Sequence, residues 1–240
     1  MSFFMKKFII TLILIILILA TSGALAFWYF RVHLEAPTPP TVSSSPNQNL
    51  PFPPINQTNN QNNSSLAPAT SLNPDFSAPL TNAKKRVTKK PFGIYVTPTA
   101  SPVKPERFTG YHTGTDFEIF PNERDKDVPV HAVCKGKLLE KITASGYGGV
   151  AVQSCTLNNE PITIVYGHLK LPSISAQTGQ ILTRDETLGT LGTDHSNETG
   201  GERKHLHLGF HKGSAINILG YVSSSGQLSN WVDPCLYVCY

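Results

Sequence analysis

The amino-acid composition changes sharply along the chain, and this change most constrains what the chain can fold into. Residues 8–30 are almost wholly apolar, and residues 36–81 hold 10 of the 19 prolines with a single charge. Residues 84–240 hold 17 of the 18 glycines and all four cysteines. A compact globule of all 240 residues is therefore excluded. The last segment, about 150 residues long, is sufficient to bury one hydrophobic core.

Charge argues against one class of partner. The net charge is +4, and residues 84–240 carry 17 Lys or Arg against 14 Asp or Glu, which is an ordinary mixed surface. A basic stripe with interleaved aromatic residues is absent from the sequence, so we expect no nucleic-acid partner. The sequence does not indicate an oligomeric state, and a monomer is assumed.

The N-terminal segment has the pattern of an export signal. Lys6 and Lys7 precede residues 8–30, an uncharged run long enough to span a hydrocarbon core of roughly 30 Å. Aromatic residues at its far end suit a membrane interface, and the lysines favour a cytoplasmic N-terminus. We predict residues 1–35 as a single-pass transmembrane signal-anchor, with the rest of the chain outside the cytoplasm. The alternative is secretion after signal-peptide cleavage, since Ala24-Leu25-Ala26 is a suitable cleavage pattern.

Residues 36–87 are predicted to be a disordered linker. They are rich in Pro, Asn, Ser and Thr, and their few apolar residues show no repeating period. Such a segment cannot bury enough surface to offset its ordering entropy. A tether that lets the outer domain search a volume above the membrane and a spacer of no fixed role both fit this composition.

Residues 88–240 are predicted to be an all-β domain with a small antiparallel sheet or sandwich. Short alternating or β-branched runs recur between glycine turns, at residues 128–133, 137–142, 149–153, 162–166 and 205–210. The sequence Gly146-Tyr147-Gly148-Gly149 indicates a hairpin between two of them. No helical period extends over three turns, and an antiparallel sheet with one packed face is the expected class.

Three segments contain histidines in chemically suggestive contexts. In residues 112–116, His112 and Asp116 flank a glycine that allows the chain to bend both side chains onto one cation. A hydrogen-bonded His/Asp turn is the alternative for this segment alone. In a strand, the period of two places His205 and His207 on one face. His168 follows a β-branched run, where a lone histidine would usually be structural or lie at the surface.

Together these segments fit a catalytic zinc site. Such sites take three protein ligands from His, Asp or Glu and leave one position for water, whose pKa falls to about 7. Nearby unligated histidines can then transfer protons. Spacing alone leaves open whether His205 or His207 binds the metal.

These motifs resemble the lysostaphin/LytM-type zinc endopeptidases that cut peptidoglycan peptides. The family's H-x-G-x-D segment matches residues 112–116, its H-x-H strand matches residues 205–207, and its tyrosine-x-histidine-leucine segment matches residues 166–169. The resemblance covers about residues 88–236 and includes further glycine and strand positions. Three features depart from the family and alter the groove walls. Gly209 stands where an acidic residue is frequent, the turn 200–204 carries Glu202, Arg203 and Lys204 instead of small residues and proline, and the segment 118–127 is long and charged.

The resemblance implies the role of each site residue. His112, Asp116 and His207 would bind one catalytic Zn²⁺, His205 would act as the base, and His168 would support the oxyanion. The chain would then be an exported zinc metalloendopeptidase, with its catalytic domain outside the cell membrane, hydrolysing peptidoglycan stem or cross-bridge peptides. The alternative is a catalytically inactive wall-binding or amidase-activating module of the same fold. All five site positions are filled in this sequence, which argues against that alternative.

Other histidines and the cysteines receive different predictions. His131 and His195 are expected to be non-catalytic loop or surface residues, and His211 to be exposed near a strand end. Four cysteines in an exported domain indicate disulfides. Of the three possible pairings we favour Cys134 with Cys155, across the hairpin, and Cys235 with Cys239. A structural zinc site of four cysteines is the alternative, but the sequence lacks its usual spacing.

Overall fold

The computed structural model describes residues 75–240, which are mostly antiparallel β-structure. This confirms the predicted β class for the domain. The predicted signal-anchor and most of the predicted linker lie outside the described residues and stay predictions. Within residues 75–240, none of the helices has both the length and the apolar character needed to cross a membrane.

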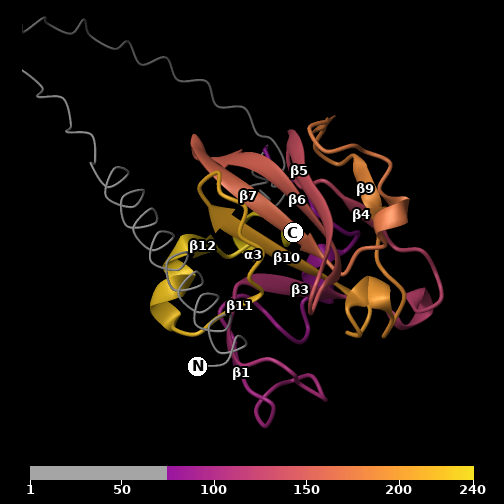
Figure 1. The fold of residues 1–240 in the computed structure, drawn as a ribbon, viewed down its shortest axis with the longest axis vertical. Helices are drawn as coiled ribbons and strands as arrows, with labels where there is room; N and C mark the ends of the chain where they lie inside the picture. Colours follow the sequence, from indigo (N-terminus) through magenta and orange to yellow (C-terminus); the bar gives the residue numbers. More distant parts are fainter. Residues whose placement is uncertain (1–74) are drawn as a thin grey trace, which may run out of the picture. The chain divides into compact units, whose positions relative to one another are not determined.

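One antiparallel sheet positions the site. Its strand order is β12-β10-β7-β6-β5-β8, and β3 pairs with β10 beside the end of this path. Figure 1 shows β5, β6, β7 and β10 lying side by side through the middle of the domain. The bounds of these strands are β3 (Gly114–Glu118), β5 (Gly136–Ala144), β6 (Gly148–Leu157), β7 (Glu160–Gly167), β8 (Ile181–Leu182), β10 (His205–Lys212) and β12 (Trp231–Val232).

Smaller elements surround this sheet. A three-stranded sheet has the order β1-β2-β11, and β4 pairs with β9. The described helices are all short, as the missing helical period predicts. These elements are β1 (Tyr95–Val96), β2 (Gly110–His112), β4 (Pro129–His131), β9 (Thr187–Thr190), β11 (Tyr221–Val222), α2 (Ala83–Arg86), α3 (Cys235–Val238) and the 3-10 helices η1 (Pro121–Glu123), η2 (Leu171–Ser173), η3 (Asn197–Thr199) and η4 (Ser225–Asn230).

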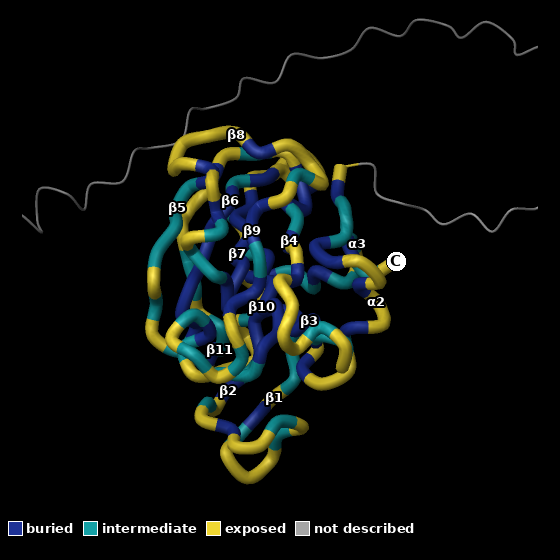
Figure 2. Tube along the Cα trace, turned by 90° about the vertical axis from the view of Figure 1, so that its right-hand side faces the viewer, coloured by how far each residue is buried: buried dark blue, intermediate teal, exposed yellow. Residues whose placement is uncertain are grey.

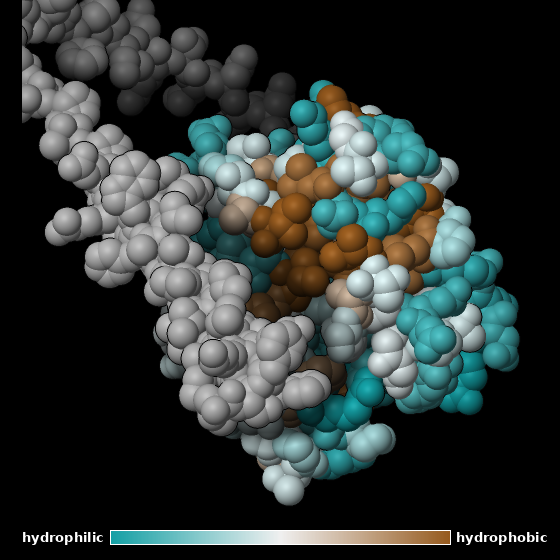
Figure 3. Space-filling model, viewed as in Figure 1, coloured by the Kyte–Doolittle hydropathy of each residue, from teal (hydrophilic) through white to brown (hydrophobic). Residues whose placement is uncertain are grey.

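The two faces of the sheet have different environments. One face packs into the main core through alternate residues of β6, β7 and β10, among them Ala151, Ile164 and Leu208. The other face carries a smaller apolar cluster that includes Val152 and Val165. Figure 2 shows that β6, β7 and β10 are buried over most of their length, whereas the connecting loops are exposed. In Figure 3, apolar residues gather over β5, β6 and β7, with polar residues around them.

The segment before residue 88 differs from the linker prediction at its end. Phe76, Leu80 and Ala83 are buried in the main core, and Arg86 of α2 is buried as well. The aromatic ring of Phe76 lies 5.6 Å from that of Phe210 in β10. The sequence-based boundary placed these residues in the linker because the segment is mostly polar and its few apolar residues show no repeating period. Each nevertheless finds a partner that is distant in the sequence.

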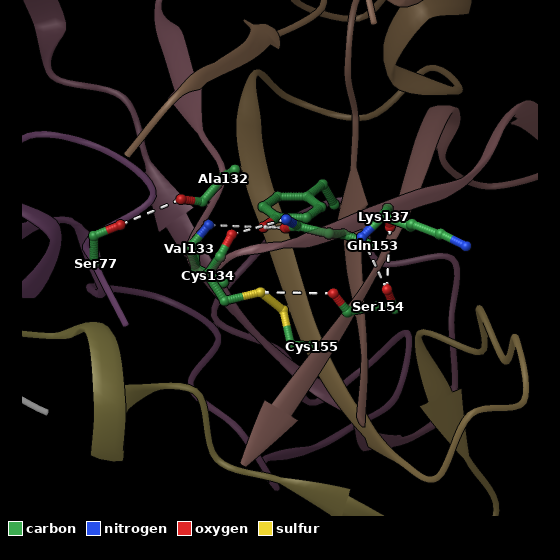
Figure 4. The surroundings of a disulfide bond; sticks show 9 residues. Ser77, Ala132, Val133, Cys134, Lys137, Gln153, Ser154 and Cys155 are labelled. Atoms are coloured by element: carbon green, nitrogen blue, oxygen red, sulfur yellow. Dashed lines mark hydrogen bonds between the residues drawn. A yellow bond between two sulfur atoms is a disulfide. The ribbon is translucent and has the colours of Figure 1, made fainter. Parts of the chain in front are cut away.

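Both favoured disulfides are present. Cys134 pairs with Cys155 and Cys235 with Cys239, with Cα–Cα distances of 6.2 and 4.6 Å. Figure 4 shows the first bridge, between Cys134 and Cys155, with Val133 and Gln153 near it. The Tyr166 hydroxyl accepts from the Val133 amide at 2.9 Å and donates to Gln153 Oε1 at 2.7 Å. This disulfide and its hydrogen bonds tie the loop after β4 to the central strands. A zinc site of four cysteines is thereby excluded, because no described cysteine is free.

Candidate metal centre

Strand register brings distant parts of the sequence to one place. In the antiparallel pairs of β10, His207 lies opposite Asp116 of β3 on one side and opposite Gly167 of β7 on the other. His168 follows Gly167 directly, and His112 ends β2, two residues before β3 begins. Because side chains alternate along β10, Leu206 and Leu208 point into the main core while His205 and His207 share the other face. The predicted alternation is confirmed.

His112, Asp116 and His207 form a compact triangle of possible ligand atoms. Nε2 of His112 lies 3.0 Å from Nδ1 of His207, and both nitrogens lie 3.2 Å from Oδ1 of Asp116. All three side chains are buried. Ligand atoms bound tetrahedrally at about 2.1 Å from one metal ion are about 3.4 Å apart. The triangle is therefore close to the size that a metal ion requires, and these three residues are the ones able to hold it within the described chain.

Hydrogen bonds around the triangle fit a metal ligand set. Nδ1 of His112 donates to the Pro91 carbonyl at 3.2 Å, so the lone pair of Nε2 faces the other two residues. Nε2 of His207 is buried and has no hydrogen-bond partner among the described residues. Nδ1 is therefore the ring nitrogen that contacts His112 and Asp116. Burial also lowers the pKa of His207 to about 4, which favours the neutral imidazole that binds metals.

Gly114 has a different role from the predicted one. It lies in β3, and its backbone is extended, so it does not supply a bend. A Cβ at this position would lie 2.7 Å from Nε2 and 2.8 Å from Cε1 of His207. The closest atom to this Cβ would be the carbonyl oxygen of Leu208, so the glycine of the H-x-G-x-D segment makes room for both the backbone of β10 and the His207 imidazole. The sequence-based reason for this glycine was wrong because the neighbouring strand lies about 90 residues away in the chain, about which local spacing says nothing.

The second oxygen of Asp116 is held by two other groups. Oδ2 accepts from Nη2 of Arg203 at 2.8 Å and lies 3.2 Å from Nε2 of His205. Burial by itself raises the pKa of the Asp116 carboxyl. The imidazoles of His205 and His112 outweigh this effect and hold the pKa well below its ordinary value. Asp116 is therefore ionised at neutral pH, as a metal ligand must be.

His168 presents one nitrogen to the site. Its Nδ1 lies 2.9 Å from the Tyr147 carbonyl and 3.0 Å from the Thr199 carbonyl, so the ring proton resides on Nδ1. Burial, followed by the nearby His205, lowers its pKa well below the ordinary value. Its backbone is left-handed, with φ of 65°, an uncommon conformation for a residue with a side chain. The neutral ring thus directs the Nε2 lone pair away from these carbonyls.

His205 lies beside His168 with a different set of partners. The two ring centroids are 4.2 Å apart. Nδ1 of His205 donates to the Arg203 carbonyl at 2.7 Å, while Nε2 faces Oδ2 of Asp116. Both nitrogens of His205 therefore face oxygen acceptors, in contrast to those of His168.

A cavity of about 360 Å³ opens onto these residues. The Tyr147 ring packs against the rings of His168 and His207, and its buried hydroxyl has no hydrogen-bond partner in the described part of the chain. Burial raises the pKa of Tyr147, so the hydroxyl keeps its proton. The cavity is lined by Lys90, Phe108, His112, Asp116, Ala144, Ser145, Gly146, Tyr147, His168, Glu202, Arg203, His205, His207, Ile218, Leu219, Gly220 and Tyr221.

The structure brings all five predicted site residues together and leaves the other histidines outside. Nδ1 of His131 donates to the Asp185 carbonyl, and His195 is exposed. His211 is half-buried against the Trp231 ring, which differs from its predicted exposure because β12 covers this end of β10. Sequence reasoning did not assign Arg203 or Tyr147 to the site. The one available signal for Arg203 was its departure from the small residues usual in that turn.

Residues 110–218 match the family model of Peptidase family M23. The chain is similar to LytU, at 22% identity over 62% of this chain and 81% of that chain, with a TM-score of 0.42. It is also similar to the catalytic domain of the antimicrobial peptidase lysostaphin from Staphylococcus simulans, at 20% identity over 63% and 92% of the two chains, with a TM-score of 0.42. A third similarity is to Csd3 of Helicobacter pylori, at 23% identity over 66% and 36%, with a TM-score of 0.38. A search of curated proteins finds no match.

Proposed function

Because residues 110–218 match the family model of Peptidase family M23, we propose that the chain is an exported zinc-dependent endopeptidase that hydrolyses peptidoglycan stem or cross-bridge peptides. The observation that carries this proposal is the triangle of His112, Asp116 and His207 at an open cavity. Two imidazole nitrogens and one carboxylate oxygen are a donor set typical of catalytic zinc. The substrate class follows from the resemblance to lysostaphin/LytM-type enzymes in three motifs.

Export is supported by two independent features of the chain. The domain holds two disulfides, which persist in oxidising compartments outside the cytoplasm. The apolar run of residues 8–30, with lysines before it, supplies an export segment that we propose to be a retained membrane anchor. Membrane fractionation with a blot for the domain tests the anchor, and recovery of the protein mainly from the medium would contradict it.

The residues around the triangle account for binding and proton transfer. A bound zinc ion supplies Lewis-acid polarisation of the scissile carbonyl and acidifies water. His168 offers a neutral Nε2 that can accept a proton from the attacking water. Nδ1 of His205 donates to the Arg203 carbonyl and Nε2 faces Oδ2 of Asp116, so Nε2 is the nitrogen placed to deliver a proton to the leaving amine. The Tyr147 ring lies against the rings of His168 and His207, and its protonated hydroxyl is a donor without a partner among the described residues.

This division of roles reverses the one that the resemblance implied. We propose His168 as the base and His205 as the proton donor, because only His168 has a ring nitrogen without an acceptor facing it. A substrate analogue whose scissile amide is replaced by a thioester separates the roles, since a thiolate leaves without protonation. His205→Ala is expected to cleave the thioester far better than the amide, relative to wild type. His168→Ala is expected to lose both activities equally, and an equal loss of both activities in His205→Ala would contradict its role as proton donor.

The central experiment measures metal content and peptidoglycan digestion with the full-length chain. We expect one zinc ion per chain and release of peptides from purified peptidoglycan. His112→Ala is expected to lose both, because one of three ligands is removed. His131→Ala is the matched control, since it deletes an imidazole that lies outside the site, and it is expected to behave as wild type. A metal-free wild-type protein, or equal digestion by His112→Ala, would overturn the proposal.

A further inference from the structure

We propose that Arg203 is a positioning residue that makes Asp116 a one-oxygen metal ligand and thereby keeps a coordination position open for water and substrate. The proposal rests on the metal site of the proposed function. It concerns a residue that this chain carries in place of the small residues usual in the turn before the H-x-H strand.

Strand pairing delivers the guanidinium to Asp116. In the β3–β10 pair, His205 lies opposite Glu118 and His207 opposite Asp116, so Arg203, two residues before His205, extends along β3. Nη2 of Arg203 donates to Oδ2 of Asp116 at 2.8 Å, and Nε lies 3.0 Å from both carboxylate oxygens of Glu118. The Arg203 side chain is 11% exposed. The planar fork of donors therefore connects two carboxylates on the same strand.

These contacts divide the two oxygens of Asp116 between two tasks. Oδ2 is occupied by Arg203 and faces His205, whereas Oδ1 lies 3.2 Å from the ring nitrogens of both His112 and His207. If the carboxylate rotated to bring both oxygens to the metal, the second oxygen would fill the position that a catalytic site keeps for water. Because rotation would break the charge-assisted bond to Arg203, the observed orientation is favoured.

An ion pair with a purely structural purpose would not need this arrangement. Glu118 alone already provides Arg203 with a carboxylate partner. The additional bond is made to a carboxylate at the metal triangle, inside the cavity that Arg203 helps to line. Hydrogen-bonding partners of ligating carboxylates orient them, and their removal typically costs about 10–100-fold in metal affinity or activity.

The test compares wild type with Arg203→Met in the full-length chain. Metal affinity is measured by competition with a chromophoric chelator, and Co²⁺ is used as a spectroscopic probe of coordination. We expect about 10-fold weaker metal binding and a changed visible Co²⁺ spectrum, because the second carboxylate oxygen of Asp116 would take the place of bound water. With metal saturating, kcat for peptide cleavage is expected to fall while KM stays unchanged.

Two further variants make the result specific. Arg86→Met removes another buried, ion-paired arginine, which bonds Glu123 and the Glu118 carbonyl but not the Asp116 carboxylate, and is expected to lower stability while metal affinity and the Co²⁺ spectrum stay as in wild type. Arg203→Lys keeps the charge but cannot connect both carboxylates, so its metal affinity is expected to lie between those of wild type and Arg203→Met.

The outcomes separate this inference from the proposed function. Wild-type metal affinity and spectrum in a folded Arg203→Met protein would overturn the inference alone, as would tighter metal binding by that variant. If Arg203→Met does not fold, the Arg203→Lys comparison decides in its place, and wild-type values there would overturn the inference. A wild-type chain that binds no metal would instead refute the proposed function.

Discussion

The two faces of β10 are equally buried but serve different purposes. Leu206, Leu208 and Phe210 are fully enclosed by the main core, while His205 and His207, on the opposite face, are 2% and 3% exposed. Burial of apolar groups stabilises the fold in proportion to the area removed from water. Burial of imidazoles is costly unless hydrogen bonds or a metal ion compensate for lost hydration.

One face of β10 therefore stabilises the fold, and the other face holds the residues of the candidate metal site. Side chains alternate, so substitutions on one face need not disturb the other. If the two faces are energetically independent, a substitution on one face should leave the property carried by the other face unchanged.

The largest effect is expected on the polar face. His207→Ala should lower peptide cleavage by a factor of about 10³ or more, because a metal ligand is lost together with the chemistry that the metal supplies. The metal-free variant should unfold at the same temperature as the metal-free wild type or above it, since Nε2 of His207 is buried without a partner. Activity assays with calorimetry check both expectations, and a large fall in the metal-free unfolding temperature would contradict the separation.

The opposite face should show the reverse behaviour. Leu208→Ala is expected to lower the free energy of unfolding by about 2–5 kcal/mol, because a fully buried side chain leaves a cavity. Well below its unfolding temperature the variant should bind metal with wild-type affinity. Urea unfolding and chelator competition measure the two quantities. Loss of metal affinity in the folded variant would show that packing beneath β10 also sets the site.

Metal removal should lower the unfolding temperature only of a chain whose polar face on β10 keeps its metal ligands. A metal ion present at 100 times its dissociation constant stabilises the folded chain by about 2.7 kcal/mol. Chelation is therefore expected to lower the unfolding temperature of wild type by about 5–10 °C for a domain of this size. The same treatment should leave His207→Ala unchanged, and an equal decrease in both proteins would indicate an effect of the chelator unrelated to this site.

The smallest effect is expected for a partly buried ion pair that lies on neither face of β10. Glu123 accepts from Arg86 at 2.7 and 2.8 Å, and this bond, against a smaller effect of burial, holds the pKa of Glu123 below its ordinary value of 4.5. Since the pKa is lower in the folded state, the stabilisation is complete above about pH 4.5 and is lost as the pH falls through the folded-state pKa. Its pH-dependent part should stay under about 1 kcal/mol because the carboxylate retains solvent contact.

Urea unfolding of wild type and Glu123→Gln measures this contribution. The stability difference between the two proteins should be larger at pH 6 than at pH 3.5. A difference that is the same at both values would show that the ion pair does not titrate as described. Metal binding at pH 6 should be identical in the two proteins.

Much of the strand framework could be predicted from local patterns. The run of residues 205–210 corresponds to β10, and residues 162–166 lie within β7. The hairpin at residues 146–149 connects β5 and β6 as predicted. These predictions depend on alternation and glycine turns, which are properties of neighbouring residues and can be read without knowing the partners.

Interactions between distant residues were the part that sequence patterns could not give. Phe76 and Leu80 were assigned to a linker although both are buried, and Gly114 was given a local reason for a tertiary contact. The contact of Arg203 with Asp116 spans 87 positions and has no local signature. Each depends on which strands become neighbours, which a single sequence leaves open.

By itself the sequence determined the residue types of the site, the alternation that separates His205 and His207 from the core side of β10, and the cysteines available for pairing. Only the tertiary structure decided which atoms meet. Strand register set His207 against Asp116, placed Arg203 on the second carboxylate oxygen, and fixed one nitrogen of His168 against two carbonyls. The physical reason is that a period of two fixes a side chain's face, whereas ligand geometry requires ångström-scale positions that arise when three strands pack together.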